Sequence, residues 1–255
     1  MKRFWLMAVA VAGSLAAQNT YENLNAVTWV QHSAEYRAVT MQTYRAAEAN
    51  LLRALADSTW TAALEQMQPA TALPPAVILD LDETVLDNSA FQARSTALHT
   101  AFTDVTWGAW VKEARAGLIP GAAQFLATAH AHGVAIFYVT NRVCEPGNAG
   151  DPTVTVVRRH NLPFDPKRLL CRTESGDKSP RRALVAQNYR VLLLVGDDYN
   201  DFLIAGSSAD ARNAAIAPYE RYFGERWFMV PNPTYGSWER AVGATVKEKL
   251  GKLRQ

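Results

Sequence analysis

The sequence predicts an α/β protein with a doubly wound, mostly parallel sheet, a helical N-terminal arm and a small cap insertion. Short apolar runs alternate with helical patterns, which is the order of βαβ units. Each apolar run ends abruptly in polar residues, as strands do at the carboxyl edge of a buried parallel sheet. The 255 residues are 49% hydrophobic and 20% charged, which is ordinary for a globular enzyme with a sizeable core.

Residues 1–17 predict a secretory signal peptide. Lys2 and Arg3 precede an apolar stretch at 4–12, and small residues follow it. This stretch is too short to span a membrane well, so cleavage after Ala16 or Ala17 would release a periplasmic or secreted protein. A retained N-terminal anchor is the alternative.

The charge balance excludes one class of partner. Without Lys2 and Arg3, the 26 Lys and Arg residues fall to the number of Asp and Glu residues, which is 24. A chain without excess positive charge gives no indication of binding a nucleic acid polymer. The sequence leaves open whether the chain forms a homodimer.

Residues 18–75 are expected to form the helical arm and a linker. From about residue 25 to residue 66 the pattern is helical, with apolar residues spaced by three or four. A break near Asp57 and Ser58 could restart a second helix. We interpret the arm as a helix packed on the core rather than as part of the catalytic site. The Pro- and Ala-rich segment 68–75 is the linker.

Residues 76–255 are expected to form the core, with four strands at 76–79, 134–139, 168–171 and 191–195. Helices are expected at 120–131, at 153–160 and from about Pro180. Between the first two strands, residues 90–117 show no long strand pattern and contain four large aromatic residues: Phe91, Phe102, Trp107 and Trp110. We interpret this insertion as a cap lying over the active site.

Acidic residues follow the first strand directly, in the segment 76–89, which reads AVILDLDETVLDNS. Because side chains alternate along a strand, Asp80 and Asp82 should face the same way, with Cα atoms roughly 6 to 7 Å apart. Two carboxylates this close are unfavourable unless one binds a proton or a cation lies between them. The structural alternative is that both acids cap a turn.

Polar residues also follow the other three strands. Thr140 follows the second strand, Lys178 lies in the turn after the third, and Asp197 and Asp201 follow the fourth. Each alone has an ordinary explanation as a strand residue, a solvated amine or a helix cap. Because parallel strands end at one sheet edge, we expect these side chains to meet Asp80 there and to form a site.

The segment DLDETVLDNS, followed in order by Thr140, Lys178 and Asp197, resembles the four motifs of the haloacid dehalogenase (HAD) superfamily. The form of the first motif is similar to that of the class C acid phosphatases, a bacterial group that includes lipoprotein 5'-nucleotidases. Residues 26–36 and the segment PNPTYGSWE at 231–239 resemble further regions of that family. The lipobox cysteine is absent because Gln18 stands at its position, so we expect no stable membrane anchor after signal cleavage.

The resemblance implies an Mg²⁺-dependent acid phosphatase that hydrolyses phosphate monoesters through an aspartyl-phosphate. Asp80 would be the nucleophile, and Asp82 would be the general acid and then the general base. One Mg²⁺ would bind the Asp80 carboxylate, the Asp82 backbone carbonyl and the Asp197 carboxylate. Two alternatives use the same residues. One is an enzyme, a phosphotransferase, and the other is an exported protein that binds a phosphorylated ligand without turnover.

The resemblance also implies roles for the remaining site residues. Thr140 and Lys178 would bind the phosphoryl group, and Asp201 would orient the metal site or its waters. The role of Asp198, where the family often has Asn, stays open. In relatives that act on nucleoside 5'-monophosphates two aromatic residues sandwich the base, and Trp107 and Tyr235 match them. Core packing is the alternative for both rings.

Two cysteines complete the sequence-based expectations. Cys144 and Cys171 follow the second and third predicted strands, which could be neighbours. In an oxidising compartment they could form a disulfide, and two buried free thiols explain the sequence about as well.

Overall fold

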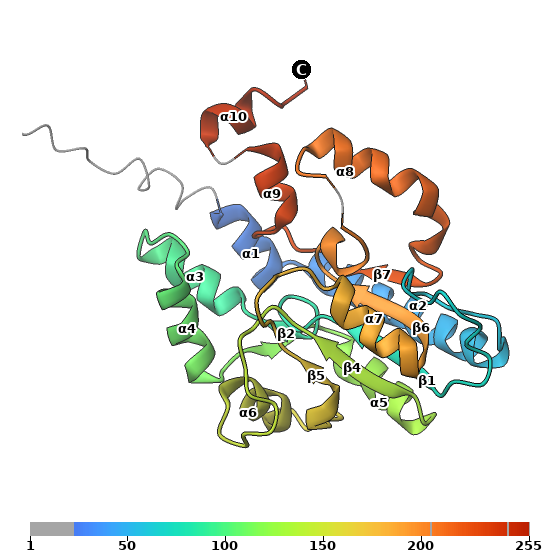
Figure 1. Cartoon of the computed structure of the whole chain (residues 1–255). Helices are drawn as coiled ribbons and strands as arrows, with labels where there is room; N and C mark the ends of the chain where they lie inside the picture. The colour runs from blue at the N-terminus through green and yellow to red at the C-terminus, as the bar shows by residue number, and fades with distance from the viewer. Residues whose placement is uncertain (1–22, 205, 244, 255) are drawn as a thin grey trace, which may run out of the picture.

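The computed structural model describes residues 23–204, 206–243 and 245–254 of the chain. The predicted signal peptide, residues 1–17, lies outside the described residues. A parallel sheet of five strands in the order β5-β4-β1-β6-β7 forms the centre of the molecule (Figure 1). In chain order the strands are β1 (Pro75–Leu79), β4 (Ala135–Val139), β5 (Leu169–Leu170), β6 (Arg190–Gly196) and β7 (Trp227–Met229).

The four predicted strands are therefore present, and all neighbouring pairs in this sheet are parallel. β7 was not predicted, because its three residues are too few to show a strand pattern. The chain runs from β1 outward through β4 to β5, and then returns to the other side of β1 to form β6 and β7. This reversal places a crevice at the carboxyl ends of β1 and β6, where open α/β sheets bind ligands.

Helices cover both faces of the sheet. One face packs against α2 (Ala34–Ala56), α5 (Ala122–Ala131) and α6 (Pro152–Arg159), and the other against α7 (Ser179–Asn188) (Figure 1). Because both faces are covered, successive residues of β1 are buried in opposite layers: Val77 and Leu79 on the α2 side, Ala76 and Ile78 on the α7 side. Burial on both faces explains why the β1 sequence is a continuous apolar run.

The helical arm packs on the core and ends at Ala56, which confirms the predicted break near Asp57, but it also has an earlier break that was not predicted. The first break is at Ser33, between α1 (Leu24–His32) and α2, where the Ser33 side chain accepts the N–H of Tyr36. The predicted restart near Asp57 and Ser58 is wrong. Asp57 instead forms a tight turn with Thr59, and the chain then runs beside β6, where Ala62 N–H bonds to Val191 O at 2.8 Å.

Gly121 allows α5 to pack closely on α2. Its φ of +96° lies in the left-handed region that favours glycine, and a Cβ there would lie 3.0 Å from the Cβ of Tyr44. Tyr44 in turn donates from its hydroxyl to the carbonyl oxygen of Thr84 at 2.6 Å, in the loop after β1. The arm therefore supports the loop that carries the first acidic motif.

The insertion consists of α3 (Ser89–Ala97) and α4 (Asp104–Glu113), which lie side by side near the short antiparallel pair β2 (Leu86–Asp87) and β3 (Gly117–Leu118) (Figure 1). After β6 the chain forms shorter elements: η3 (Tyr199–Asp201), α8 (Ala209–Ile216), η4 (Ala217–Tyr222), α9 (Ser237–Val242) and α10 (Val246–Leu250). Another short turn, η2 (Pro166–Arg168), precedes β5. Among the described helices, none combines the length and apolar character needed to cross a membrane.

A disulfide joins Cys144 and Cys171, whose Cα atoms are 5.7 Å apart. The two cysteines follow β4 and β5, which are neighbours in the sheet. The disulfide therefore connects the loop after β4 to the end of β5, and the alternative of two free thiols is not what the structure contains.

Candidate active site

Three carboxylates converge at the carboxyl edge of the sheet. Asp80 follows β1, Asp197 follows β6, and Asp201 lies in η3. One carboxylate oxygen of each lies within 4.8 Å of the others. The N–H of Asp80 bonds to Val195 O at 3.0 Å, which extends the pairing of β1 with β6 to this point. The acids that follow the first and fourth predicted strands thus meet at the reversal of the strand order.

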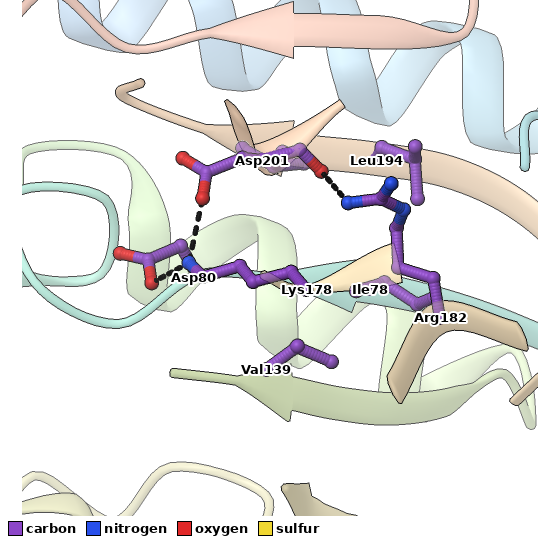
Figure 2. A pocket seen from close by; sticks show the side chains of 8 residues that line it. Ile78, Asp80, Val139, Lys178, Arg182, Leu194 and Asp201 are labelled. Carbon is purple, nitrogen blue, oxygen red and sulfur yellow. Dashed lines mark hydrogen bonds and ion pairs between the residues drawn. The ribbon is translucent and has the colours of Figure 1, made fainter. Parts of the chain in front are cut away.

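Lys178 lies between two of these acids, as Figure 2 shows. Its Nζ contacts the Asp80 carboxylate and donates to Asp201 Oδ1 at 2.6 Å, and its side chain is only 6% exposed. Burial alone would lower the pKa of Lys178, but the Asp201 and Asp80 carboxylates outweigh it and raise that pKa. Lys178 therefore stays a cation, although apolar side chains such as Ile78 and Val139 line the same small pocket (Figure 2).

The cluster has more negative than positive charge. Burial raises the pKa of Asp80 to about 7; Lys178 opposes the shift, while Asp201 and Asp82 add to it. Burial also raises the pKa of Asp197 well above its usual value, and Asp201 and Asp80 raise it further. The side chains of this cluster offer carboxylate oxygens only, the donors that hard divalent cations such as Mg²⁺ prefer. A divalent cation would supply the missing positive charge, so these residues fit one.

Asp197 is oriented by two donors that the sequence reasoning missed. Thr84 Oγ1 donates to Asp197 Oδ1 at 3.0 Å, and Asn232 Nδ2 donates to Asp197 Oδ2 at 2.8 Å. Both donors lie inside segments that the sequence had marked as motifs, the first acidic motif and PNPTYGSWE. Their position in those segments was the only indication in the sequence of a role at the site.

Asp82 lies next to the cluster but is not part of it. Its carboxylate accepts hydrogen bonds from Arg142 at 2.7 to 3.0 Å and from Asn88 Nδ2 at 2.9 Å. Its side chain is 17% exposed, whereas that of Arg142 is 2% exposed. Arg142 comes two residues after Thr140, and the sequence reasoning gave it no role. Asp82 is thus more exposed to solvent than its neighbours Asp80 and Glu83, which are both buried.

Thr140 ends β4 at the same sheet edge. Its side chain is fully buried, and its Oγ1 accepts the N–H of Arg142 at 3.1 Å. Its backbone oxygen accepts a hydrogen bond from Arg181 at 2.5 Å. Among the described residues Oγ1 acts only as an acceptor, so its hydroxyl proton can be donated to a ligand.

Glu83 is a buried acid that the sequence reasoning left without a role. Its φ of +58° is unusual for a residue other than glycine. Its Oε1 accepts the N–H of Asn88 at 3.0 Å, and its Oε2 accepts the hydroxyl of Tyr235. Burial, followed by repulsion from Asp82, raises the pKa of Glu83 to about 8. Glu83 therefore links the first motif to the C-terminal segment.

Asp198 has a structural role in the described residues. Its Oδ1 accepts the N–H of Asn200 at 2.9 Å, which caps η3, and its carboxylate also accepts the N–H and hydroxyl of Ser237 at the start of α9. Asp198 is thereby tied to the same C-terminal segment that supplies Asn232 and Tyr235.

The two candidate clamp aromatics approach the first motif from different parts of the chain. Trp107, on α4, is partly buried against Phe91, and the guanidinium of Arg142 lies 5.6 Å from its ring centre. Tyr235 binds Glu83 through its hydroxyl. Trp107 is therefore linked to Asp82 through Arg142, and Tyr235 contacts Glu83 directly.

Comparisons with known proteins find similarity over nearly the whole chain. The family model "HAD superfamily, subfamily IIIB (Acid phosphatase)" matches residues 2–238. A solved structure of the class C acid phosphatase from Bacillus anthracis is 31% identical to this chain, with a TM-score of 0.80, over 92% of this chain and 98% of that one. A second structure of that class C acid phosphatase, with tungstate bound, is 30% identical, with the same TM-score and the same coverage.

Proposed function

Because the chain belongs to the acid phosphatases of HAD subfamily IIIB and is a phosphoric monoester hydrolase, we propose that it acts through an aspartyl-phosphate on Asp80 with the help of Mg²⁺. The observation that carries this proposal is the meeting of Asp80, Asp197 and Asp201 around Lys178 at the sheet edge. This arrangement combines a nucleophile, a cation-binding set of oxygens and a fixed positive charge.

In the first half-reaction, Asp80 would attack phosphorus while the bond from phosphorus to the alcohol oxygen breaks. Lys178 and Thr140 lie at the end of the sheet where they can bind phosphoryl oxygens. Asp82 would give its proton to the departing alcohol. The difference in burial is compatible with this division of roles, because Asp80 lies inside the charged cluster and Asp82 is more exposed to solvent.

In the second half-reaction, Asp82 would accept a proton from water as the water oxygen bonds to phosphorus and the bond to Asp80 breaks. The bound Mg²⁺ would supply positive charge that neutralises the phosphoryl oxygens and the carboxylates. The Asp80 and Asp197 carboxylates and the Asp82 backbone carbonyl would hold it, and Asp201 would orient this set through Lys178.

Nucleoside 5'-monophosphates are the substrate class we propose. Trp107 contacts Arg142, which binds Asp82, and Tyr235 contacts Glu83, so we propose that a leaving group bound near Asp82 stacks on one of these rings. One structure of the Bacillus anthracis relative has tungstate bound. Tungstate is a tetrahedral oxyanion like phosphate, so its binding is compatible with a phosphoryl site in this family. The predicted signal peptide supports a periplasmic or secreted location, and the disulfide is compatible with an oxidising compartment.

The test is hydrolysis of para-nitrophenyl phosphate and of nucleoside 5'-monophosphates at about pH 5 to 6, with Mg²⁺ or with EDTA. We expect activity that requires Mg²⁺ and that Asp80→Asn lowers on the order of 10³-fold or more, because the amide is a poor nucleophile. Added glycerol distinguishes hydrolysis from phosphoryl transfer, since transfer would yield glycerol phosphate. Equal activity in EDTA would contradict the metal assignment, and no turnover of either kind would indicate a binding protein.

A further inference from the structure

The carboxylate of Asp82 is held by a guanidinium fork. Arg142 Nε donates to Asp82 Oδ1 at 2.9 Å and to Oδ2 at 3.0 Å, and Arg142 Nη2 donates to Oδ1 at 2.7 Å. Two nitrogens on one carboxylate fix both its position and the direction of its plane, which a single contact does not. The Asp82 side chain is therefore held in one orientation.

The guanidinium is itself held by the insertion. It lies 5.6 Å from the ring centre of Trp107, and its Nη2 is 3.4 Å from Asn88 Oδ1. Asn88 Oδ1 also accepts the indole N–H of Trp110 at 2.8 Å, and Asn88 Nδ2 donates to Asp82 Oδ1. A connected set of hydrogen bonds thus runs from α4 through Asn88 to Asp82, and Arg142 belongs to it.

The two oxygens of Asp82 are not equivalent. Oδ1 accepts from Asn88 Nδ2 and from both nitrogens of the Arg142 fork, whereas within the described residues Oδ2 accepts only the longer bond from Nε. A carboxylate oxygen has about two acceptor sites, so Oδ1 is saturated and Oδ2 is not. Oδ2 is the oxygen that can carry a proton to or from a ligand.

We propose that Arg142 is a positioning residue that holds Asp82 so that Oδ2 faces the leaving-group oxygen. This inference rests on the proposed function. As the Asp80–phosphorus bond forms and the phosphorus–alcohol bond breaks, the proton on Oδ2 passes to the alcohol oxygen. As water then bonds to phosphorus and the Asp80–phosphorus bond breaks, Oδ2 takes a proton from that water. Both proton transfers need the same orientation of Asp82.

The inference predicts a loss that depends on the leaving group. An alkyl alcohol is a poor leaving group that needs the proton, whereas dinitrophenolate leaves without one. Arg142→Met keeps the apolar stem and removes the fork. We expect this variant to lower kcat/KM for an alkyl phosphate by about 10- to 100-fold, which is a large part of what general acid catalysis contributes. For 2,4-dinitrophenyl phosphate we expect kcat/KM to fall by less than about 3-fold.

A second readout follows from the second half-reaction. With dinitrophenyl phosphate, formation of the aspartyl-phosphate stays fast in Arg142→Met, while its hydrolysis slows because Oδ2 no longer faces the water. We therefore expect a rapid burst of dinitrophenolate, equal to the concentration of active sites, before a slower steady state. A general loss of structure would produce no such burst.

Two further variants serve as controls. Arg181→Met removes another arginine that binds the same loop, at the Thr140 carbonyl and at Asn141 Oδ1, without touching Asp82. We expect it to affect both substrates equally. Arg142→Lys keeps a buried cation and tests the fork if Arg142→Met does not fold. Because lysine cannot form the fork, this variant should lose about 10-fold on the alkyl phosphate and less than about 3-fold on the aryl ester.

The outcomes separate this inference from the proposed function. Equal losses on both esters in Arg142→Lys, or in a folded Arg142→Met, would overturn the positioning role and leave the phosphatase proposal intact. A wild-type enzyme that hydrolyses neither ester would overturn both. Thermal unfolding of every variant, followed by circular dichroism, identifies those that fold.

Discussion

Among single residues, the charged groups near the predicted strand ends were predictable, and some of the donors that hold them were not. Asp80, Asp197 and Lys178 could be found because the sheet edge follows from the strand pattern, and they meet there. Arg142 and Asn232 were missed, because neither occupies a motif position to which the resemblance gives a role and no local pattern encodes their pairing with Asp82 and Asp197. The sequence therefore indicates where charges gather, but it does not indicate which donor holds each one.

Glu83 provides a test at this scale. Burial raises its pKa from 4.5 to about 8. A carboxyl with a higher pKa in the folded state contributes stability that is full below about pH 4.5 and is lost as the pH rises to about 8. Glu83→Gln stays neutral and can still accept from Tyr235. In EDTA, we expect the melting temperature of the wild type to fall relative to that of Glu83→Gln across this pH range.

The measurement is thermal unfolding of both proteins at a series of pH values in EDTA. The other buried carboxyls are present in both proteins, so the difference reports Glu83 together with its repulsion of Asp197, whose pKa Glu83 raises. If the melting temperatures of the two proteins change with pH in parallel, Glu83 does not have the raised pKa that its burial predicts.

Among elements, the long and strongly patterned ones were predictable, and most short ones were not; β5 is the exception, because its two residues lie in the predicted run 168–171. β1, β4 and β6 follow from apolar runs, whereas β7 and the β2–β3 pair have only two or three residues each. The predicted second helix near Asp57 is absent because tertiary contacts determine the conformation there. The helix pattern there continues in the sequence, but Trp60 is buried and its indole N–H bonds to Leu192 O at 2.9 Å, which keeps the segment extended beside β6.

The disulfide is the element-scale feature with the clearest energetic test. It closes a loop between Cys144 and Cys171, which are 27 residues apart in sequence. Closing a loop of this length reduces the entropy of the unfolded chain, which corresponds to about 3 to 4 kcal/mol. We expect Cys144→Ser with Cys171→Ser to lower the free energy of unfolding in urea by about that amount. The wild type treated with a strong reductant should match the double variant, and a difference below about 1 kcal/mol would contradict the expectation.

Across the whole molecule, the site is assembled from distant parts of the chain. The arm supports the first loop through Tyr44, the insertion contacts Arg142 through Trp107, and the C-terminal segment 232–237 binds three acids. Those three acids are Glu83, Asp197 and Asp198. The parallel sheet and its site-bearing edge were predictable. The contacts of the C-terminal segment with the three acids were not, because the segment PNPTYGSWE has no strand or helix pattern of its own.

Asn232 tests whether this closure matters for metal binding. Asn232→Ala removes the donor to Asp197 Oδ2, so Asp197 should be less well oriented toward a cation. Loss of such an outer partner typically weakens metal affinity by 10- to 100-fold, and we expect a change on the order of 10-fold or more for Mn²⁺ as a probe, measured by calorimetry. Asn188→Ala, which removes an exposed asparagine bonded only to Leu184 O in its own helix, should leave the affinity unchanged. Equal affinities in the wild type and Asn232→Ala would contradict the role.

The position of Asn232 also has a consequence for biosynthesis. Its partner Asp197 precedes it by 35 residues, so a nascent chain that has emerged only as far as η3 carries its acids without this donor. The set of groups around Asp197 becomes complete only when the ribosome has made almost the entire polypeptide. Prematurely terminated products that end before this point would therefore bind a cation more weakly than the finished chain.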